Sequence, residues 1–328
     1  MVGRLRPGML ELAIATASSY LIKKFFLTHK ELKVILWRHM SNYLKEMRLG
    51  DQQTLEKKPD LRILSLGAGV QSSTLLMKIY NDEIEPVDAA IFADTGNEPQ
   101  EVYEWFEFLK EKVSDKIPII IVNNDRNTGD ITKDILSPSG FFASIPVFVK
   151  NSNGKQGLTL RTCTDRYKIQ PINKKIRELL DVTNLRGKVV EVVMGISFDE
   201  IQRAKQPPNK WAVNCYPLIE NKISRHDCLH YFELLGFPQP PRSACIICPY
   251  HDNKEWQRIK DKHPKEFEYA LDFDKQLRSN KKSQFVSKLD GELFLHRKMQ
   301  PLSDIDFVAE DDPQYSLFDD ECDGYCGV

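Results

Sequence analysis

The chain has 328 residues, of which 41% are hydrophobic and 28% are charged, values typical of a globular enzyme. Its formal net charge is -1, so its overall electrostatics do not indicate a nucleic-acid-binding protein. We find no run long and apolar enough to cross a bilayer and expect no secretory signal, which predicts a cytoplasmic protein without a membrane partner. Seven cysteines, an odd number, argue against a disulfide framework and favour metal binding or redox chemistry.

Residues 1–58 are predicted to form a basic, helical extension, from the apolar spacing of Leu32, Ile35, Leu36 and Tyr43. A linker is predicted around residues 50–59, which are polar and include Gly50 and Pro59. Three interpretations of the extension stay open: it binds a partner or nucleic acid, it targets the protein to an organelle, or translation starts later, at Met40 or Met47.

The most informative segment joins an apolar predicted strand, Leu61–Leu66, to a predicted helix over residues 73–80. Two glycines between them, Gly67 and Gly69, let the backbone turn tightly and approach a ligand closely. Free loop amides and the amino end of a helix attract an anion, so the segment favours phosphate binding. The alternative is an ordinary turn capped by Ser72. The predicted nucleotide-binding residues here are Ser65, Gly67, Ala68, Gly69, Gln71, Ser72 and Ser73.

A second polar segment, Asp94 to Pro99, follows the next apolar run, residues 87–93. Polar residues beyond the carboxyl ends of adjacent parallel strands lie in the crevice where such sheets bind ligands. We expect Asp94 and Glu98 to orient Mg²⁺ on nucleotide phosphates, because Mg²⁺ favours one or two carboxylates together with phosphate oxygens. The alternative is that Asn97 or Glu98 caps the following helix.

Strand and helix patterns then alternate. A helix is predicted over Gln100–Val113, with aromatic residues that pack on the sheet, then a strand at 117–122, a helix at 168–180 and a strand at 188–196. This alternation predicts an α/β fold: a parallel sheet with helices on both faces. We divide the chain into the extension, a nucleotide-binding domain over residues 59–250, and an irregular, mostly helical part over residues 251–328.

The two polar segments resemble the pyrophosphate loop and acidic turn of the adenine nucleotide α-hydrolase-like superfamily, and within it the phosphoadenosine phosphosulfate (PAPS) reductase family. The family loop usually reads Ser-Gly-Gly-Lys-Asp-Ser, so Val70 and Gln71 replace its lysine and aspartate. Residues 195–203 resemble the family's Gly-Ile-Arg-x-x-Glu-x-x-Arg segment, with Ser197 in place of the first arginine. The resemblance covers roughly residues 61–249 and implies that ATP, or PAPS or APS, binds with Mg²⁺.

The resemblance also places several residues near the nucleotide. Gly195 and Lys168 are expected to line its site, and Asp94 and Arg203 are expected to take part in catalysis. Arg203 can pair with phosphate or sulfate oxygens through its planar guanidinium, although an ion pair with a neighbouring carboxylate is the alternative. Basic groups such as Lys168 offset the polyphosphate charge in the transition state.

Cys245 and Cys248, separated by two residues, can hold one metal centre. Iron–sulfur members of the family carry two adjacent cysteines earlier in the chain and a Cys-x-x-Cys later, so Cys163, which follows Thr162, is the expected third ligand. Three thiolates would leave one iron of a [4Fe–4S] cluster open to hydrosulfide. A zinc site completed by His251, or no metal, are the alternatives. Cys215 and Cys228 are expected to fill apolar space.

The tail carries Cys322 and Cys326. Sulfonucleotide reductases end in a Glu-Cys-Gly element whose cysteine attacks the substrate sulfur and forms a thiosulfonate, and Cys322 would take that role. The two cysteines are alternatively a redox pair, a fourth cluster ligand, or incidental thiols.

These features lead to three functional hypotheses. The first is ATP-dependent sulfur transfer, yielding AMP and pyrophosphate, to an acceptor such as tRNA or DNA, with a sulfur donor protein as partner. The second is a sulfonucleotide reductase that releases sulfite and uses thioredoxin. The third is a non-catalytic nucleotide-binding subunit of a modification or defence complex, which the altered loop residues Val70 and Gln71 favour.

Overall fold

The computed structural model describes residues 58–126, 128–139 and 144–308. The basic extension expected over residues 1–58 therefore lies outside the described residues, apart from Lys58, as do Cys322 and Cys326. The chain divides into two units between Lys58 and Pro59, and only the second is discussed below. Of the helices that the structure describes, none combines the length and the apolar character that a membrane crossing requires.

A five-stranded parallel sheet forms the centre of the described part. Its strand order is β3-β2-β1-β6-β7, and every neighbouring pair runs parallel. The strands are β1 (Leu61–Leu66), β2 (Ala89–Ala93), β3 (Ile119–Val122), β6 (Val190–Met194) and β7 (Ala212–Cys215). The order changes direction between β1 and β6, and sheets of this kind bind ligands outside the carboxyl ends of the strands at that point. The predicted α/β fold is confirmed.

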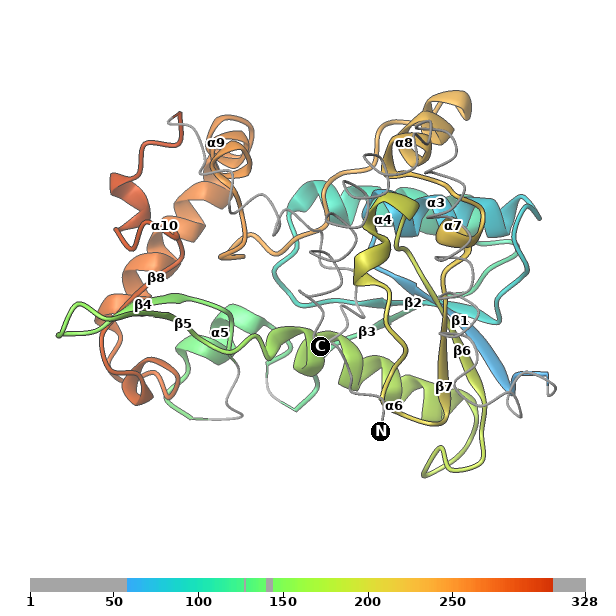
Figure 1. The fold of residues 1–328 in the computed structure, drawn as a ribbon, viewed down its shortest axis with the longest axis horizontal. Helices are drawn as coiled ribbons and strands as arrows, with labels where there is room; N and C mark the ends of the chain where they lie inside the picture. The colour runs from blue at the N-terminus through green and yellow to red at the C-terminus, as the bar shows by residue number, and fades with distance from the viewer. Residues whose placement is uncertain (1–57, 127, 140–143, 309–328) are drawn as a thin grey trace, which may run out of the picture. The chain divides into compact units, whose positions relative to one another are not determined.

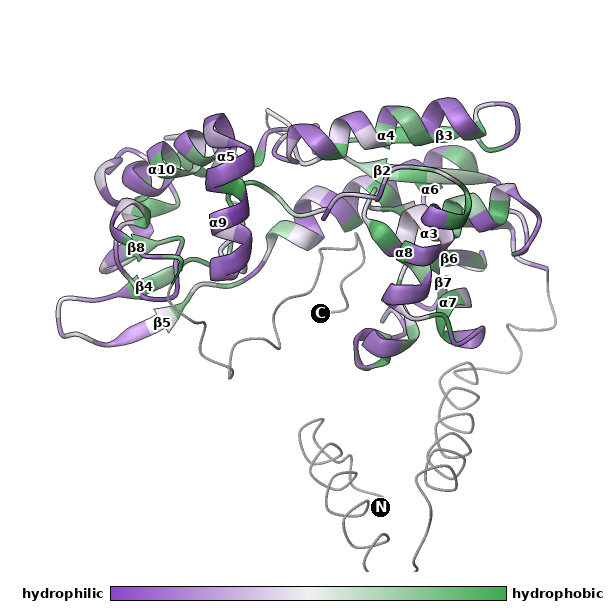
Figure 2. Ribbon diagram, turned by 90° about the horizontal axis from the view of Figure 1, so that it is seen from above, coloured by the Kyte–Doolittle hydropathy of each residue, from purple (hydrophilic) through white to green (hydrophobic). Residues whose placement is uncertain are grey.

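Helices cover both faces of this sheet. The helices α3 (Val70–Tyr80), α4 (Gln100–Val113) and α8 (Arg225–Leu234) lie on one side, and α6 (Gln170–Leu179) lies on the other (Figure 1). The predicted aromatic face of α4 is buried: Trp105 and Phe106 share a core with Leu64 of β1. Purple and green alternate along α4 in Figure 2, as expected for a helix with one apolar face.

A second core joins two distant parts of the chain. It holds an antiparallel sheet in the order β5-β4-β8, built from β4 (Phe148–Lys150), β5 (Gln156–Leu158) and β8 (Glu292–Phe294). The helices α5 (Ile131–Leu136), α9 (Asn253–Lys262) and α10 (Pro264–Ser279) contribute to the same core, which includes Trp256 and Phe273. Residues 131–158 therefore pack with residues 247–307.

Several elements differ from the sequence prediction. Helix α3 begins at Val70, three residues before the predicted start. The predicted helix at 168–180 is a π-helix, Thr164–Ile169, that continues into α6. Strand β7 was not predicted, because it has four residues and a buried Asn214 interrupts its apolar pattern. The short elements are Phe198–Arg203, α7 (Pro217–Glu220), Val286–Lys288 and Leu302–Asp304.

Candidate functional site

Residues 67–69, between β1 and α3, have the geometry of an anion site, and we call them the phosphate loop. Ala68 has a φ of +57°, and Gly69 occupies the N-cap position of α3 without a side-chain hydrogen bond to the helix amides. The alternative interpretation required Ser72 to cap the helix, and it does not. Its hydroxyl accepts from the Gly67 amide at 3.2 Å and reaches the Gly69 carbonyl oxygen at 3.4 Å. The first-turn amides of α3 are therefore available to a phosphate.

Neighbouring elements hold this loop in place. The end of β6 approaches it so closely that a Cβ atom on Gly195 would lie 2.7 Å from the Ser72 nitrogen. The Ser243 hydroxyl donates to the Gly67 carbonyl oxygen. Behind the loop, the Trp105 indole donates to the Ser73 hydroxyl at 2.9 Å, so that hydroxyl points into the core. Sequence reasoning placed Gly195 near the nucleotide but missed Ser243, which has no local signal.

Gln71 is fully buried and takes part in a polar network. Its amide nitrogen donates to Glu200 at 3.1 Å, and its oxygen accepts from the Arg225 guanidinium at 2.9 Å. Glu200 also forms an ion pair with Arg203 at 2.6 Å, which is the alternative anticipated for that arginine. Arg225 was not among the site residues predicted from the sequence. It is the first residue of α8, directly after the capping box of Ser224. The network links the altered loop position to two guanidinium groups.

The acidic turn after β2 presents one carboxylate oxygen of Asp94. The Gly96 amide and the Tyr103 hydroxyl both donate to Oδ1 of Asp94 at 2.8 Å, and no described residue donates to Oδ2. Burial, together with the hydrogen bond to Asp94, holds the pKa of Tyr103 well above its usual range. Gly96 has a φ of +68°, and a Cβ there would lie 2.9 Å from the Asp130 backbone, so this position requires glycine.

A buried ion pair lies beside the same turn. The Lys168 ammonium is 3.6 Å from Oε1 of Glu98, and their side chains are only 4% and 1% exposed. Thr95 donates to the same carboxylate oxygen at 3.3 Å. Lys168 comes from the π-helix, an irregularity that frequently marks functional positions. Sequence reasoning placed both Lys168 and Glu98 near the nucleotide phosphates. In the structure they form an ion pair with each other.

Residues 243–248, which we call the cysteine turn, bridge the two loops. Cys245 Sγ lies 3.4 Å from Thr95 Oγ1 and 4.0 Å from Oε1 of Glu98. The Ile246 amide donates to the Asn97 carbonyl oxygen at 2.9 Å, while Ser243 bonds to the phosphate loop as described above. The thiol of Cys245 therefore sits at the carboxyl ends of β1 and β2.

Cys163 and Cys248, the last residue of the cysteine turn, both lie close enough to Tyr250 to affect its hydroxyl. Burial raises the pKa of the Tyr250 hydroxyl, the charge of Arg161 lowers it, and the two cysteines raise it again. The Arg161 guanidinium carbon lies 5.6 Å from the centre of the Tyr250 ring. Cys163 therefore lies in the same region as Cys248, while Cys245 contacts the acidic turn.

Within residues 58–308, as far as they are described, no three His, Cys, Asp or Glu side chains form a group able to hold a metal ion. Cys163, Cys245 and Cys248 do not form such a group in this structure, so we derive no reaction step through a metal. The His251 ring faces the Cys245 carbonyl oxygen at 3.0 Å rather than a thiol. Burial and the charge of Arg242 lower its pKa to about 4, so the ring is neutral at pH 7.

The remaining two described cysteines have a packing role. Cys228 is fully buried in the core between α3 and α8, and Cys215 packs against that core from β7, as expected. Burial raises the pKa of the Cys228 thiol to about 12.

A basic cavity of about 350 Å³ lies beyond the carboxyl end of β3. Four cationic side chains and one carboxylate line it, and the carboxylate, Asp125, pairs with Lys174. Its lining residues are Asn124, Asp125, Arg126, Arg166, Gln170, Pro171, Asn173, Lys174 and Arg177. A cavity with this excess of positive charge suits an anionic ligand.

Together, the strand order, the uncapped loop and the cysteine turn define an α/β protein in which a cysteine thiol lies beside the loops that follow β1 and β2. No protein-family model matches the chain. No curated protein matches it. One similar solved structure is a crystal structure of PAPS reductase from Candida auris in complex with phosphate. It shares 15% identity, the match covers 65% of this chain and 90% of that chain, and the TM-score is 0.37. We draw no functional conclusion from so distant a likeness.

Proposed function

We propose that the protein is an ATP-dependent enzyme that transfers sulfur to a nucleic acid or another acceptor. The observation that carries this proposal is the position of the cysteine turn. It bonds to the phosphate loop through Ser243 and to the acidic turn through Cys245 and Ile246. A thiol placed beside an anion site at the switch point of the sheet couples nucleotide chemistry to sulfur chemistry.

The proposed reaction has two steps. An acceptor oxygen attacks the α-phosphate of ATP, forms an adenylated acceptor and releases pyrophosphate. Hydrosulfide, supplied by the sulfur donor and bound beside the cysteine turn, then attacks the activated atom and forms a bond to it, and AMP leaves with the former acceptor oxygen. The α3 amides would bind the phosphates. Oδ2 of Asp94 fits a Mg²⁺ ion, because the Gly96 amide and the Tyr103 hydroxyl both donate to Oδ1 of that carboxylate.

The basic cavity supports a polyanionic acceptor such as tRNA or DNA, despite the net charge of -1. Cationic side chains gathered at one place bind phosphate groups regardless of the charge of the whole chain. Arg166 of this cavity and Lys168 of the buried ion pair both belong to the π-helix. A polyanion bound by Arg166 would therefore lie within one helical turn of Lys168, which contacts the acidic turn of the proposed reaction centre.

Product analysis under anaerobic conditions tests the proposal against the other two hypotheses. The enzyme is incubated with ATP, sulfide and nucleic acid, and separately with PAPS or APS and thioredoxin. We expect AMP and pyrophosphate from ATP. Sulfite from a sulfonucleotide, lost on Cys322→Ser, would instead identify a reductase. Tight ATP binding without turnover would identify an accessory subunit.

Whether the cysteines also hold a metal is a separate prediction. Iron, acid-labile sulfide and zinc are measured after anaerobic purification of the wild type and of Cys245→Ala. Iron and sulfide that are lost in the variant would identify an iron–sulfur centre. Stoichiometric zinc would make the cysteines structural ligands.

A further inference from the structure

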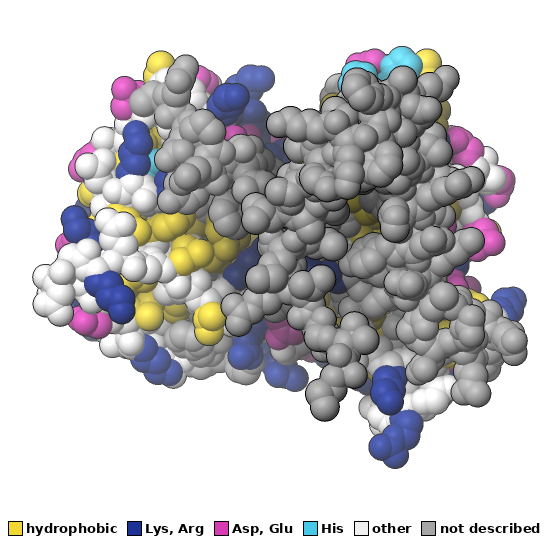
Figure 3. Space-filling view, in the orientation of Figure 1, with side chains coloured by type: hydrophobic (Ala, Val, Ile, Leu, Met, Phe, Trp, Pro, Cys, Tyr) yellow, Lys and Arg dark blue, Asp and Glu magenta, His cyan; other side chains and the backbone are white. Residues whose placement is uncertain are grey.

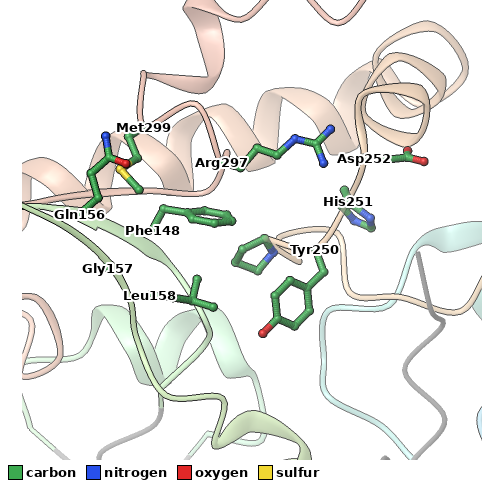
Figure 4. A pocket seen from close by; sticks show the side chains of 10 residues that line it. Phe148, Gln156, Gly157, Leu158, Tyr250, His251, Asp252, Arg297 and Met299 are labelled. Carbon is green, nitrogen blue, oxygen red and sulfur yellow. The ribbon is translucent and has the colours of Figure 1, made fainter. Parts of the chain in front are cut away.

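A second cavity of about 350 Å³ adjoins the cysteine turn and is mainly apolar. Phe148 and Leu158 line it from the antiparallel sheet, and Pro249 and Tyr250 line it directly after Cys248 (Figure 4). In Figure 4, His251 and Asp252 lie at one end, and Gln156 and Met299 lie at the other. Figure 3 shows a yellow apolar surface over the region of β4 and β5, where Leu158 is 49% exposed.

His251 gives this apolar cavity one directional polar group. Its Nε2 lies 3.0 Å from the Cys245 carbonyl oxygen, which can only accept, so Nε2 carries the hydrogen. Nδ1 is then a hydrogen-bond acceptor. It is buried, and no described residue donates to it. A buried acceptor without a donor costs free energy, and a ligand N–H would remove that cost.

The size and the walls of the cavity define its ligand. At about 350 Å³ it lies near the lower limit of small-molecule sites, so it admits a ring system rather than a whole nucleoside triphosphate. The rings of Phe148 and Tyr250 offer faces for stacking, and Arg297 adds a positive charge. A flat, aromatic group with an N–H donor and a nearby negative charge meets all of these features.

We infer that this cavity binds one unpaired base of a single-stranded nucleic acid. The inference rests on the proposed function, for which it would bring the acceptor base beside the cysteine turn. Single-stranded nucleic acids are recognised through bases stacked on aromatic side chains, with cations along the backbone. A base in the cavity would be held by Tyr250, with its N–H donating to Nδ1 of His251.

The probe is a single-stranded 12-mer, in RNA and in DNA form, with 2-aminopurine at its centre. Stacking quenches the fluorescence of this base, so quenching shows that the base is stacked on a side chain. The anisotropy of a label at the end of the strand measures binding. We expect the wild type and Tyr250→Phe to bind and quench. Tyr250→Ala should bind about tenfold more weakly, the loss expected for one stacked base, and should quench less. The matched control is Tyr231→Ala, a half-buried tyrosine of α8.

His251→Leu tests the acceptor atom, with ATP affinity and the thermal midpoint as checks that the turn is intact. It should reduce the affinity of the 2-aminopurine strand while ATP affinity stays unchanged. Binding without quenching by the wild type would overturn the inference, as would equal quenching by Tyr250→Ala. Competition by ATP, or by free 2-aminopurine riboside at the same concentration as the strand, would show that the cavity takes a small molecule instead. Quenching without release of AMP would refute the proposed function and leave the base site standing.

Discussion

The thiol of Cys245 lies 3.4 Å from the Thr95 hydroxyl, although the two residues are 150 positions apart in the chain. This contact places a sulfur atom at the end of β2, one strand away from the phosphate loop. Ser243, two residues earlier, bonds to that loop. The cysteine turn therefore contacts both loops of the proposed nucleotide site, and its position leads to the following expectations.

Gly195→Ala should weaken ATP binding. The added methyl group would lie 2.7 Å from the Ser72 nitrogen and push the phosphate loop away from β6. Overpacking of this kind costs about 1–3 kcal/mol, and we expect a similar loss of binding free energy in calorimetric titrations. Gly157→Ala is the control, because a methyl group there meets open space. Unchanged ATP affinity in Gly195→Ala would place the nucleotide elsewhere.

Lys168→Met should destabilise the fold. It leaves the Glu98 carboxylate buried without its ammonium partner, and breaking a buried pair costs about 3–5 kcal/mol. The double variant Lys168→Met with Glu98→Gln should recover part of this loss. Urea unfolding measures the change. Lys174→Met breaks an exposed ion pair and should destabilise the fold much less than Lys168→Met does. Equal losses in both single variants would contradict the buried-pair interpretation.

Stability should fall between pH 6.5 and pH 4 partly because of His296. Burial lowers the pKa of this histidine to about 4, so the folded state stays neutral while the unfolded state binds a proton. The contribution of neutral His296 to the free energy of unfolding is therefore fully present above pH 6.5. It is lost as the pH falls towards 4, and the loss from this group is about 3 kcal/mol at most. His296→Gln should flatten the pH dependence of the unfolding free energy. The exposed His230→Gln should not, and an unchanged slope in His296→Gln would be inconsistent with this account.

Arg126→Ala and Arg177→Ala should weaken nucleic-acid binding in a salt-dependent way. Each arginine lines the basic cavity and can neutralise one phosphate. Removing a phosphate contact reduces the slope of log K against log salt by about one and acts equally on all sequences. Titrations between low and physiological salt measure the slope. The exposed Arg186→Ala serves as control, and equal slopes in all variants would remove the basic cavity from the acceptor site.

Much of the fold could be predicted from local patterns, because β1, β2, β3 and β6 are apolar runs and α4 has one apolar face. The strands of the antiparallel sheet have only three residues each, too few to show a period. The second core was not predicted because it joins residues more than a hundred positions apart. Such pairings depend on tertiary contacts rather than on local propensity.

Some features of the candidate site could likewise be predicted from local sequence, and others could not. Glycines and hydroxyls near the strand ends marked the phosphate loop, and the Cys-x-x-Cys spacing marked the turn. Nothing local indicated that Ser243 would bond to Gly67, or that Gln71 would bind Arg225. The acceptor at Nδ1 of His251 follows only from the position of the Cys245 carbonyl oxygen.

The most direct test of the central claim is a double measurement with radiolabelled sulfide and ATP under anaerobic conditions. Total tRNA and fragmented DNA are supplied as acceptors, and sulfur incorporation is compared with AMP formation. We predict that the wild type and the control Cys215→Ser incorporate one sulfur per AMP, and that Cys245→Ser binds ATP but incorporates none. ATP bound without AMP formation, or equal incorporation by Cys245→Ser, would contradict the account.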